Sequence, residues 1–422
     1  MLQRNLTQLS IICVILTSFA YAGGPVYSRY GIGDLYYFAG SRSYAMGGVG
    51  AGLIGDGFIN RLNPAGLASI TSTRFSGTFE YSNYSSTDPS GSARYAKGDF
   101  GGLAVAIPVA RDYGIVLIGE LTPYSSARYA IERDDSQLGI TSNEQFYGSG
   151  GISRFDVGSS LSITKSLHVG VKIDYLAGTV SQTTDLAFTD NTYSNSELTF
   201  SDHYSGLTYT LGVNYEGIGD LFNSSLLKPL VLGAILETPA SLDLREERFT
   251  LTSSQYDTIS TRYGTADIPA FVALGASYKF SDRYVVGADF ASQDWSSTKF
   301  LGSPPVVDDV TGMIVRLRNS TRVSVGLEVL PSKDAVSYMS HLIYRAGFYY
   351  SSSYLQIGNQ AIDGMFFTAG IGLPIGPESY LDLGFQAGVN GTTDNGLQKD
   401  TIFRITASIS ASELWFVRLQ ED

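Results

Sequence analysis

Few residues in the sequence could support catalysis. The chain has 3 His, at positions 168, 203 and 341, and 1 Cys. His203 lies two positions from Ser205, so the two side chains would share one face of a strand. A serine hydrolase also needs a third group that orients the histidine, and the sequence nominates none. The histidines also lack metal-site spacing. We therefore expect a protein that is not an enzyme and holds no metal or cofactor.

Gly50, Gly52 and Gly55 fit the glycine pattern of a dinucleotide-binding loop. Such a loop needs a strand before it, a helix after it and an acidic residue about 20 positions later. None of these contexts is convincing here, so we expect no bound nucleotide. The formal net charge of −12 likewise argues against nucleic acid as a partner.

Isolated ionisable residues lie on the polar faces of segments that otherwise alternate apolar and polar. The candidate cations are Arg154, Lys172, Arg345 and Arg404, and acidic residues share these faces. If the segments are membrane-spanning strands, a charge facing lipid costs roughly 2–4 kcal/mol at mid-membrane, so these groups face the lumen. Most are expected to pair with one another or with the N-terminal part of the chain. One or two of the cations could hold a ligand carboxylate.

Fourteen segments are expected to be strands. In one of them Val169, Val171 and Ile173 alternate with Gly170 and Lys172, because strand side chains point to opposite faces. The segments lie near 73–84, 98–110, 113–130, 144–164, 167–186, 196–216, 229–249, 258–280, 283–296, 312–330, 340–357, 361–374, 378–392 and 400–416.

A soluble β-sandwich would show the same alternation. Here the polar faces carry mostly Gly, Ser, Thr and single charges, and short turns alternate with long polar loops, which is typical of outer-membrane barrels. The two connections near 217–228 and 331–339 are long for the short-turn side and are expected to form small periplasmic helices. We predict an all-β fold, a transmembrane antiparallel β-barrel of about fourteen strands.

Composition agrees with this class. Charged residues make up 16% of the chain, below the roughly 25% usual in soluble proteins. No apolar run of 20 residues follows the N-terminus, which excludes a polytopic helical membrane protein. With 1 Cys in 422 residues, a disulfide scaffold is excluded as well.

The first 22 residues resemble a secretory signal peptide. Arg4 precedes a short apolar stretch, and Ala20-Tyr21-Ala22 fits a cleavage site, so the mature chain is expected to begin at Gly23. The alternative is a retained anchor, which the shortness of the apolar stretch disfavours. The localisation that follows is the outer membrane, with both termini in the periplasm because the strand count is even.

A motif between residues 41 and 68 points to a family. The run Met46-Gly47-Gly48 is followed by Asp56 and then by Asn63, Pro64 and Ala65, directly before the first predicted strand. This resembles the N-terminal region of the FadL/TodX family of outer-membrane transporters, and the start at Tyr27-Ser28-Arg29 looks like that of its Bacteroidota-type relatives. Alternatively, Asn-Pro-Ala only shapes the start of the first strand.

The resemblance implies a plug, or hatch, formed by residues 23–72 inside a barrel formed by residues 73–422. It also implies that hydrophobic ligands leave sideways through a gap in the third strand. Pro123 falls within that predicted strand and cannot donate a ladder hydrogen bond, so it is our candidate for the gap. The alternative is a proline at the outer rim, where pairing ends.

The leading hypothesis is an outer-membrane channel for passive uptake of hydrophobic or amphipathic small molecules such as long-chain fatty acids. Its partners would be membrane lipid and the ligand. Relatives of the same barrel family imply an alternative, a barrel associated with type IX secretion that acts through protein partners. A general porin is the third hypothesis, which a lumen-filling hatch argues against.

Overall fold

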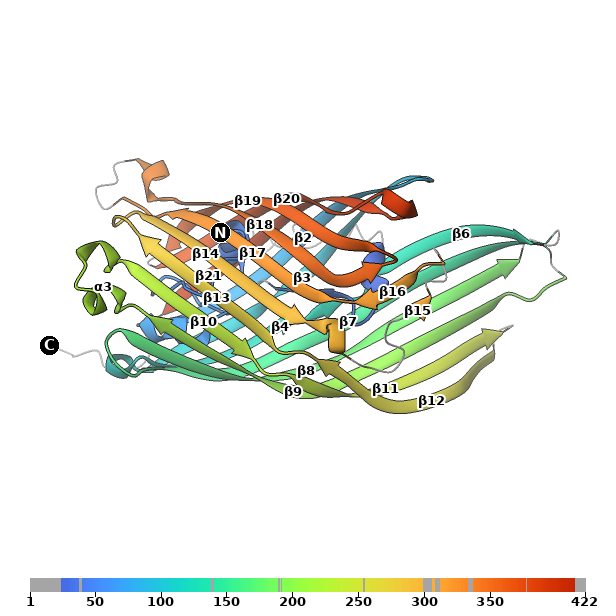
Figure 1. Cartoon of the computed structure of the whole chain (residues 1–422), viewed down its shortest axis with the longest axis horizontal. Coiled ribbons are helices and arrows are strands. Elements are labelled where there is room, and N and C mark those ends of the chain that lie inside the picture. The colour runs from blue at the N-terminus through green and yellow to red at the C-terminus, as the bar shows by residue number, and fades with distance from the viewer. Residues whose placement is uncertain are drawn as a thin grey trace, which may run out of the picture.

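The computed structural model describes residues 24–37, 40–137, 140–188, 190, 192–252, 255–298, 306–307, 312–332, 337–376 and 378–413. The predicted signal peptide lies outside these residues. The described chain forms a closed antiparallel β-barrel of 14 strands (Figure 1), which confirms the predicted fold class. The first and last strands of the wall pair with each other from Thr73↔Glu413 to Thr87↔Lys399 and close the barrel.

Most wall strands are single elements. They are β2 (Thr73–Asp88), β3 (Gly91–Ala110), β7 (Ile140–Ser162), β8 (Leu167–Phe188), β9 (Ser196–Tyr215), β14 (Tyr284–Asp294), β18 (Ile343–Ile357), β19 (Gln360–Gly376), β20 (Ser379–Gly391) and β21 (Lys399–Glu413).

The remaining wall positions are divided into shorter elements. They are β4 (Ile115–Pro123) with β5 (Ser125–Ser126) and β6 (Tyr129–Gln137), β10 (Leu230–Glu237) with β11 (Ala240–Thr252), β12 (Gln255–Ile268) with β13 (Phe271–Lys279), and β16 (Ile314–Leu317) with β17 (Asn319–Val329). The two-residue β15 (Val306–Val307) is a neighbour of β16 and pairs with it in antiparallel fashion. The segments at 229–249 and 258–280, expected to be continuous, are interrupted at Pro239 and Pro269. Proline has no N–H to donate to the ladder, so each strand breaks there.

The apolar side of each strand faces outward. In β8, Val171, Ile173 and Tyr175 are exposed, whereas Lys172 and Asp174 between them are buried. The outward side chains form an apolar surface suited to lipid acyl chains, and the charged groups face the lumen.

The two ends of the barrel differ. At one end, which we call the short-turn end, the connections are short or hold small helices. These helices are η3 (Arg111–Tyr113), α3 (Ile218–Leu221), η4 (Ser225–Leu227) and η6 (Tyr338–His341). The small helices expected near 217–228 and 331–339 are therefore present. At the opposite end, β6 to β9, β11 and β12 extend farthest from the body of the barrel (Figure 1). That end also holds η5 (Trp295–Ser297) and η7 (Asp394–Gly396).

No helix in the described ranges has the length and apolar character needed to cross a membrane.

Residues 24–37 and 40–72, which we call the N-terminal segment, contact the wall from the lumen side. The segment contains η1 (Val26–Arg29), β1 (Asp34–Leu35), α2 (Ser41–Ala45) and η2 (Pro64–Ser69). Near the end opposite the short turns, which we call the long-strand end, Tyr27, Tyr30 and Ile32 share a buried apolar cluster with Trp295 and Tyr354 of the wall. The segment and the wall therefore have a common core.

Wall glycines allow the backbone of the segment to approach closely. A Cβ at Gly326 or Gly347 would lie 2.4 Å from backbone atoms of Met46 or Gly47, and one at Gly233 would lie 1.9 Å from the Ala51 carbonyl oxygen. Several of these glycines are register partners on adjacent strands. We call the set the glycine band: Gly170, Gly212, Gly233, Gly275, Gly287, Gly326, Gly347 and Gly370. Side chains at these positions would displace the segment.

Candidate ligand cavity at a break in the barrel wall

Asn63 connects two parts of the N-terminal segment to the wall. Its side-chain oxygen accepts a hydrogen bond from the Ala65 N–H at 3.0 Å and caps η2, whose first residue is Pro64. Its Nδ2 donates to the Ala51 carbonyl at 2.6 Å and to the Val213 carbonyl of β9 at 3.2 Å. The Asn-Pro-Ala motif therefore fixes both a local turn and a long-range contact.

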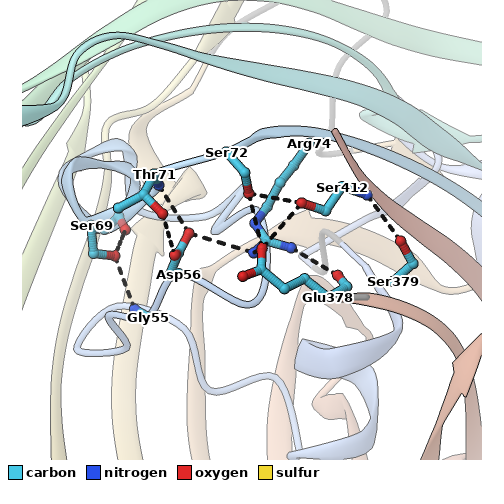
Figure 2. A network of polar contacts seen from close by, with 10 residues as sticks. Gly55, Asp56, Ser69, Thr71, Ser72, Arg74, Glu378, Ser379 and Ser412 are labelled. Carbon is cyan, nitrogen blue, oxygen red and sulfur yellow. Dashed lines mark hydrogen bonds and ion pairs between the residues drawn. The ribbon is translucent and has the colours of Figure 1, made fainter. Parts of the chain in front are cut away.

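Asp56 lies where the segment passes into the wall (Figure 2). Its carboxylate accepts hydrogen bonds from the Thr71 N–H at 2.9 Å and the Thr71 hydroxyl at 2.6 Å. Arg74 of β2 lies between Asp56 and Glu378, with nitrogen–oxygen distances of 3.5 and 3.2 Å. Ser412 of β21 donates to the same Glu378 carboxylate. This network joins the segment to both strands of the closing seam.

The glycine-rich run at 50–55 binds a carboxylate of the wall. The N–H groups of Gly50 and Ala51 both donate to Asp289 Oδ2 of β14, at 2.7 and 2.8 Å. Adjacent backbone N–H groups form a concave anion site, and here the anion belongs to the protein itself. In the described structure, the site that resembles a phosphate-binding loop therefore serves as an anchor.

A buried ion network crosses from the segment to the wall. Arg61 Nε donates to Glu120 Oε2 of β4 at 3.0 Å. Lys172 Nζ lies 2.7 Å from Glu120 and 3.2 Å from Asp156. Arg154 continues the network, with nitrogen–oxygen distances of 3.2 Å to both Asp156 and Glu237. Burial in this environment favours paired charges.

The other two predicted cations also face carboxylates. Arg345 lies 2.8 Å from Glu328 and 2.5 Å from Asp382, and Arg42 of α2 binds the same Glu328. Arg404 Nε lies 3.6 Å from Glu80 Oε1. All four candidate cations therefore point into the lumen beside an acidic partner.

The wall is broken beside Pro123. β3 pairs with β4 only from Leu103 to Ala110, and β4 ends at Pro123. Among the strand pairings of the described residues, residues 91–102 of β3 pair only with β2, and β6 pairs only with β7. These facing edges of β3 and β6 therefore make no ladder with each other. The short β5 pairs instead with β1 of the N-terminal segment.

Polar side chains meet across this break. Arg128, between β5 and β6, donates to Asp99 of β3 at 3.0 Å, and Lys97 lies 3.0 Å from the same carboxylate. Tyr36 of the N-terminal segment donates to Asp99 Oδ2 at 3.1 Å, and its backbone N–H donates to the Tyr124 carbonyl. Burial raises the pKa of the Tyr36 phenol well above its usual range, so it stays a donor. The break is held closed by side chains in place of backbone hydrogen bonds.

A cavity opens on the lumen side of the break. It encloses about 640 Å³ of space between atoms, counting its open side. Three of the predicted site residues, Pro123, Arg154 and Lys172, line it. Most other lining residues are apolar or aromatic, including Leu35, Tyr37, Leu62, Tyr124, Ile235 and Phe271. We call it the break cavity.

A second cavity lies on the other side of Tyr36 and Tyr37. Its lining is more polar and includes Lys97, Arg322 and Arg404 together with Asp34 and Glu80. Arg322 stacks over the ring of Tyr349, 4.0 Å from its centroid. Burial raises the pKa of the Asp34 carboxyl to about 6, against the opposing effect of Lys97 and Arg404.

The whole chain, residues 1–422, matches the model of the protein family described as BamG. The chain belongs to the BamG family. No curated protein matches it in sequence.

Solved structures resemble this BamG family member in fold. A FadL homologue of Pseudomonas aeruginosa has a TM-score of 0.59 and 13% identity, over 90% of this chain and 98% of that one. The toluene transporter TbuX of Ralstonia pickettii has a TM-score of 0.56 and 15% identity, over 89% and 98%. The toluene transporter TodX of P. putida has a TM-score of 0.55 and 17% identity, over 91% and 100%.

The histidines of this BamG family member bind residues that the sequence analysis did not nominate. His168 lies 2.8 Å from the Ser162 hydroxyl and 2.9 Å from Glu216. His203 contacts Thr179 at 2.9 Å and Glu247 at 3.3 Å. Among the described residues, no group of three or more His, Cys, Asp or Glu side chains is arranged to hold a metal ion.

Proposed function

We propose that this BamG family member is an outer-membrane channel for passive uptake of hydrophobic or amphipathic small molecules. The observation that carries the proposal is the break cavity, which is lined by apolar and aromatic side chains together with Pro123 and Tyr124, at the point where β4 ends and the wall is broken. A ligand in this cavity would need only side chains of the break to move before it reached the lipid outside the wall. It would not need to cross a hydrated pore.

The ion network limits which ligands suit the break cavity. Arg154 and Lys172 already pair with carboxylates, so a ligand carboxylate would have to displace a buried partner at high cost. We therefore expect uncharged or weakly polar ligands there. A long-chain fatty acid would place its head group in the second cavity, where Arg404 Nε lies 3.6 Å from Glu80 and makes no hydrogen bond among the described residues.

The membrane placement is part of the same proposal. The outward apolar surface fits a bilayer, and residues 1–22 would direct the chain out of the cytoplasm. The described chain ends at the short-turn end, so we propose that this end faces the periplasm. Lipid and the transported ligand would be the partners.

The experiment is native mass spectrometry of the gently extracted protein, with identification of retained small molecules. Thr122 faces the break cavity and Leu121, its neighbour, faces outward. Thr122→Trp fills the cavity, whereas Leu121→Trp adds the same ring on the outside of the strand. We expect the parent and Leu121→Trp to retain a hydrophobic ligand and Thr122→Trp to lose it. Equal retention by both variants would contradict the proposed cavity.

A second candidate function is an accessory barrel that acts through a protein partner, as in type IX secretion. It is favoured by the tall strands at the long-strand end, which extend well beyond the rest of the wall (Figure 1). The same spectra separate the two functions. A retained polypeptide without a small-molecule ligand would favour the accessory role.

A further inference from the structure

Two connections at the short-turn end expose large apolar side chains. In the connection between β9 and β10, Leu221, Phe222 and Leu226 are 68%, 66% and 71% exposed. In the connection between β17 and β18, Tyr338 and Met339 are 61% and 63% exposed. Water-exposed side chains of this size, grouped on two connections at the same end of the barrel, indicate a surface that is covered in use.

A tyrosine on the outer face of the wall fastens each connection. Tyr278 of β13 donates its hydroxyl proton to the Leu226 carbonyl at 2.8 Å. Its neighbour Ser277 points into the lumen and binds the Gly52 carbonyl, so Tyr278 lies on the lipid-facing side. This contact joins η4 to an outward-facing side chain of the wall.

The second connection repeats the arrangement. Tyr344 of β18 donates to the Met339 carbonyl at 3.0 Å. Its neighbours Ile343 and Arg345 are buried, so Tyr344 also faces outward. Both connections are therefore joined to outward-facing tyrosines of the wall.

The apolar surface is continuous from the wall to the first connection. The rings of Tyr278 and Phe280 lie 5.8 Å apart between centroids, and those of Phe280 and Tyr284 lie 6.3 Å apart. Phe280 and Tyr284 are both exposed on the outer face. Aromatic residues in this position favour the membrane–water boundary, and the exposed Asp220 and Lys228 of the same connection would reach the head groups.

We propose that the α3–η4 and η6 connections are interfacial anchors that bury these five apolar side chains in the lipid leaflet at the short-turn end. The occupant is lipid because the exposed residues continue the outer surface of the barrel. Short apolar elements beside an aromatic belt sit at the boundary between head groups and acyl chains. The inference does not depend on what the barrel transports.

Spin-label accessibility in vesicles of phosphatidylethanolamine and phosphatidylglycerol tests the proposal. Cys13, the single cysteine, lies within the predicted leader, so single cysteines can be placed in a mature chain without another thiol. The test variants are Phe222→Cys and Met339→Cys. The matched controls are Asp220→Cys and Ser337→Cys, whose side chains are exposed in the same two connections. Heat-dependent gel migration verifies that each variant is folded.

We expect labels at 222 and 339 to be several-fold more accessible to oxygen than to a water-soluble nickel chelate, and the control labels to show the opposite preference. Nickel accessibility at 222 and 339 equal to that of the controls would place the connections in water and overturn the proposal. Low accessibility to both reagents would mean that protein covers the side chains, which would also overturn it.

Discussion

Arg61 of the N-terminal segment and Glu120 of β4 form a buried ion pair with 3.0 Å between Nε and Oε2. The pair lies just before the wall opens at Pro123. A Cβ at Gly102, where the pairing of β3 with β4 ends, would lie 2.1 Å from the Arg61 guanidinium. Arg61, which anchors the N-terminal segment to β4, therefore also fills the space beside Gly102, where the pairing of β3 with β4 ends.

Removing Glu120 is expected to destabilise the protein more than removing Arg61. Glu120→Gln leaves the buried Arg61 without its carboxylate and leaves Lys172 with Asp156 alone, a loss of about 3–5 kcal/mol. In Arg61→Met, Glu120 keeps Lys172 at 2.7 Å, so the loss is smaller. Urea titration followed by heat-dependent gel migration measures both. Equal losses would show that Lys172 does not compensate the charge of Glu120.

Locking the break should prevent lateral exit of the ligand. We expect Asp99→Cys with Arg128→Cys, joined by a short bifunctional thiol reagent, to lose most uptake of radiolabelled toluene or oleate by Gram-negative cells that lack another such channel. Asp99 and Arg128 belong to opposite sides of the break, so the link holds its edges together.

The control for the lock is Ser292→Cys with Thr321→Cys. These residues are register partners in β14 and β17, which pair along their length. A link between them therefore closes no break in the wall. If both linked variants took up ligand as well as the parent, the exit would lie elsewhere.

Gly47→Ala should release the N-terminal segment from the wall. Gly47 has φ +70°, and a Cβ there would lie 2.6 Å from the Phe348 carbonyl oxygen and 2.8 Å from that of Val325. The left-handed backbone alone costs an alanine roughly 1–2 kcal/mol, before the steric overlap. We expect faster proteolysis of the segment and higher conductance in planar bilayers. Gly57→Ala has open space around its Cβ and should behave like the parent.

Docking of β1 should weaken as the pH rises. Because burial raises the pKa of Asp34 from 3.8 to about 6, the folded segment binds this proton more tightly than the unfolded one does, and stability falls as the pH rises from about 4 to above 6. Asp34→Asn should remove this fall in stability with rising pH. We expect the variant to resist protease better than the parent at about pH 8, and equally below about pH 4.

The control for this titration is Asp112→Asn, at an exposed position in η3. It should keep the pH profile of the parent. If Asp34→Asn had the same pH dependence of protease resistance as the parent, another group would be responsible for it.

Local pattern was enough to predict the barrel, because alternation at period two and turn residues are properties of neighbouring residues. The breaks at Pro239 and Pro269 carried the same signal as Pro123 and could have been found from it. The ion pairs could not, since pairing depends on register. The partner of the Gly50–Ala51 run is Asp289, 239 positions after Gly50, and nothing in the local sequence links the two.

The partners of the lumen cations were also beyond what local sequence patterns could predict. Alternation placed Arg154 and Lys172 on a lumen face, but it did not reveal that Glu237 and Glu120 come from other strands to neutralise them. Arg61 gave no signal in the local sequence, because its role depends on the contact with Glu120 of β4, 59 positions later.

The glycine band has a consequence for how the protein folds. At that level eight of the wall strands contribute no side chain to the interior, so without the N-terminal segment their backbone would face water. The backbone of the N-terminal segment packs against these glycines, and the strands in turn supply partners for its buried polar groups. The two parts therefore complete each other, and neither has a finished hydrophobic centre alone. Closure of the barrel wall and docking of the N-terminal segment should therefore occur in one cooperative folding transition.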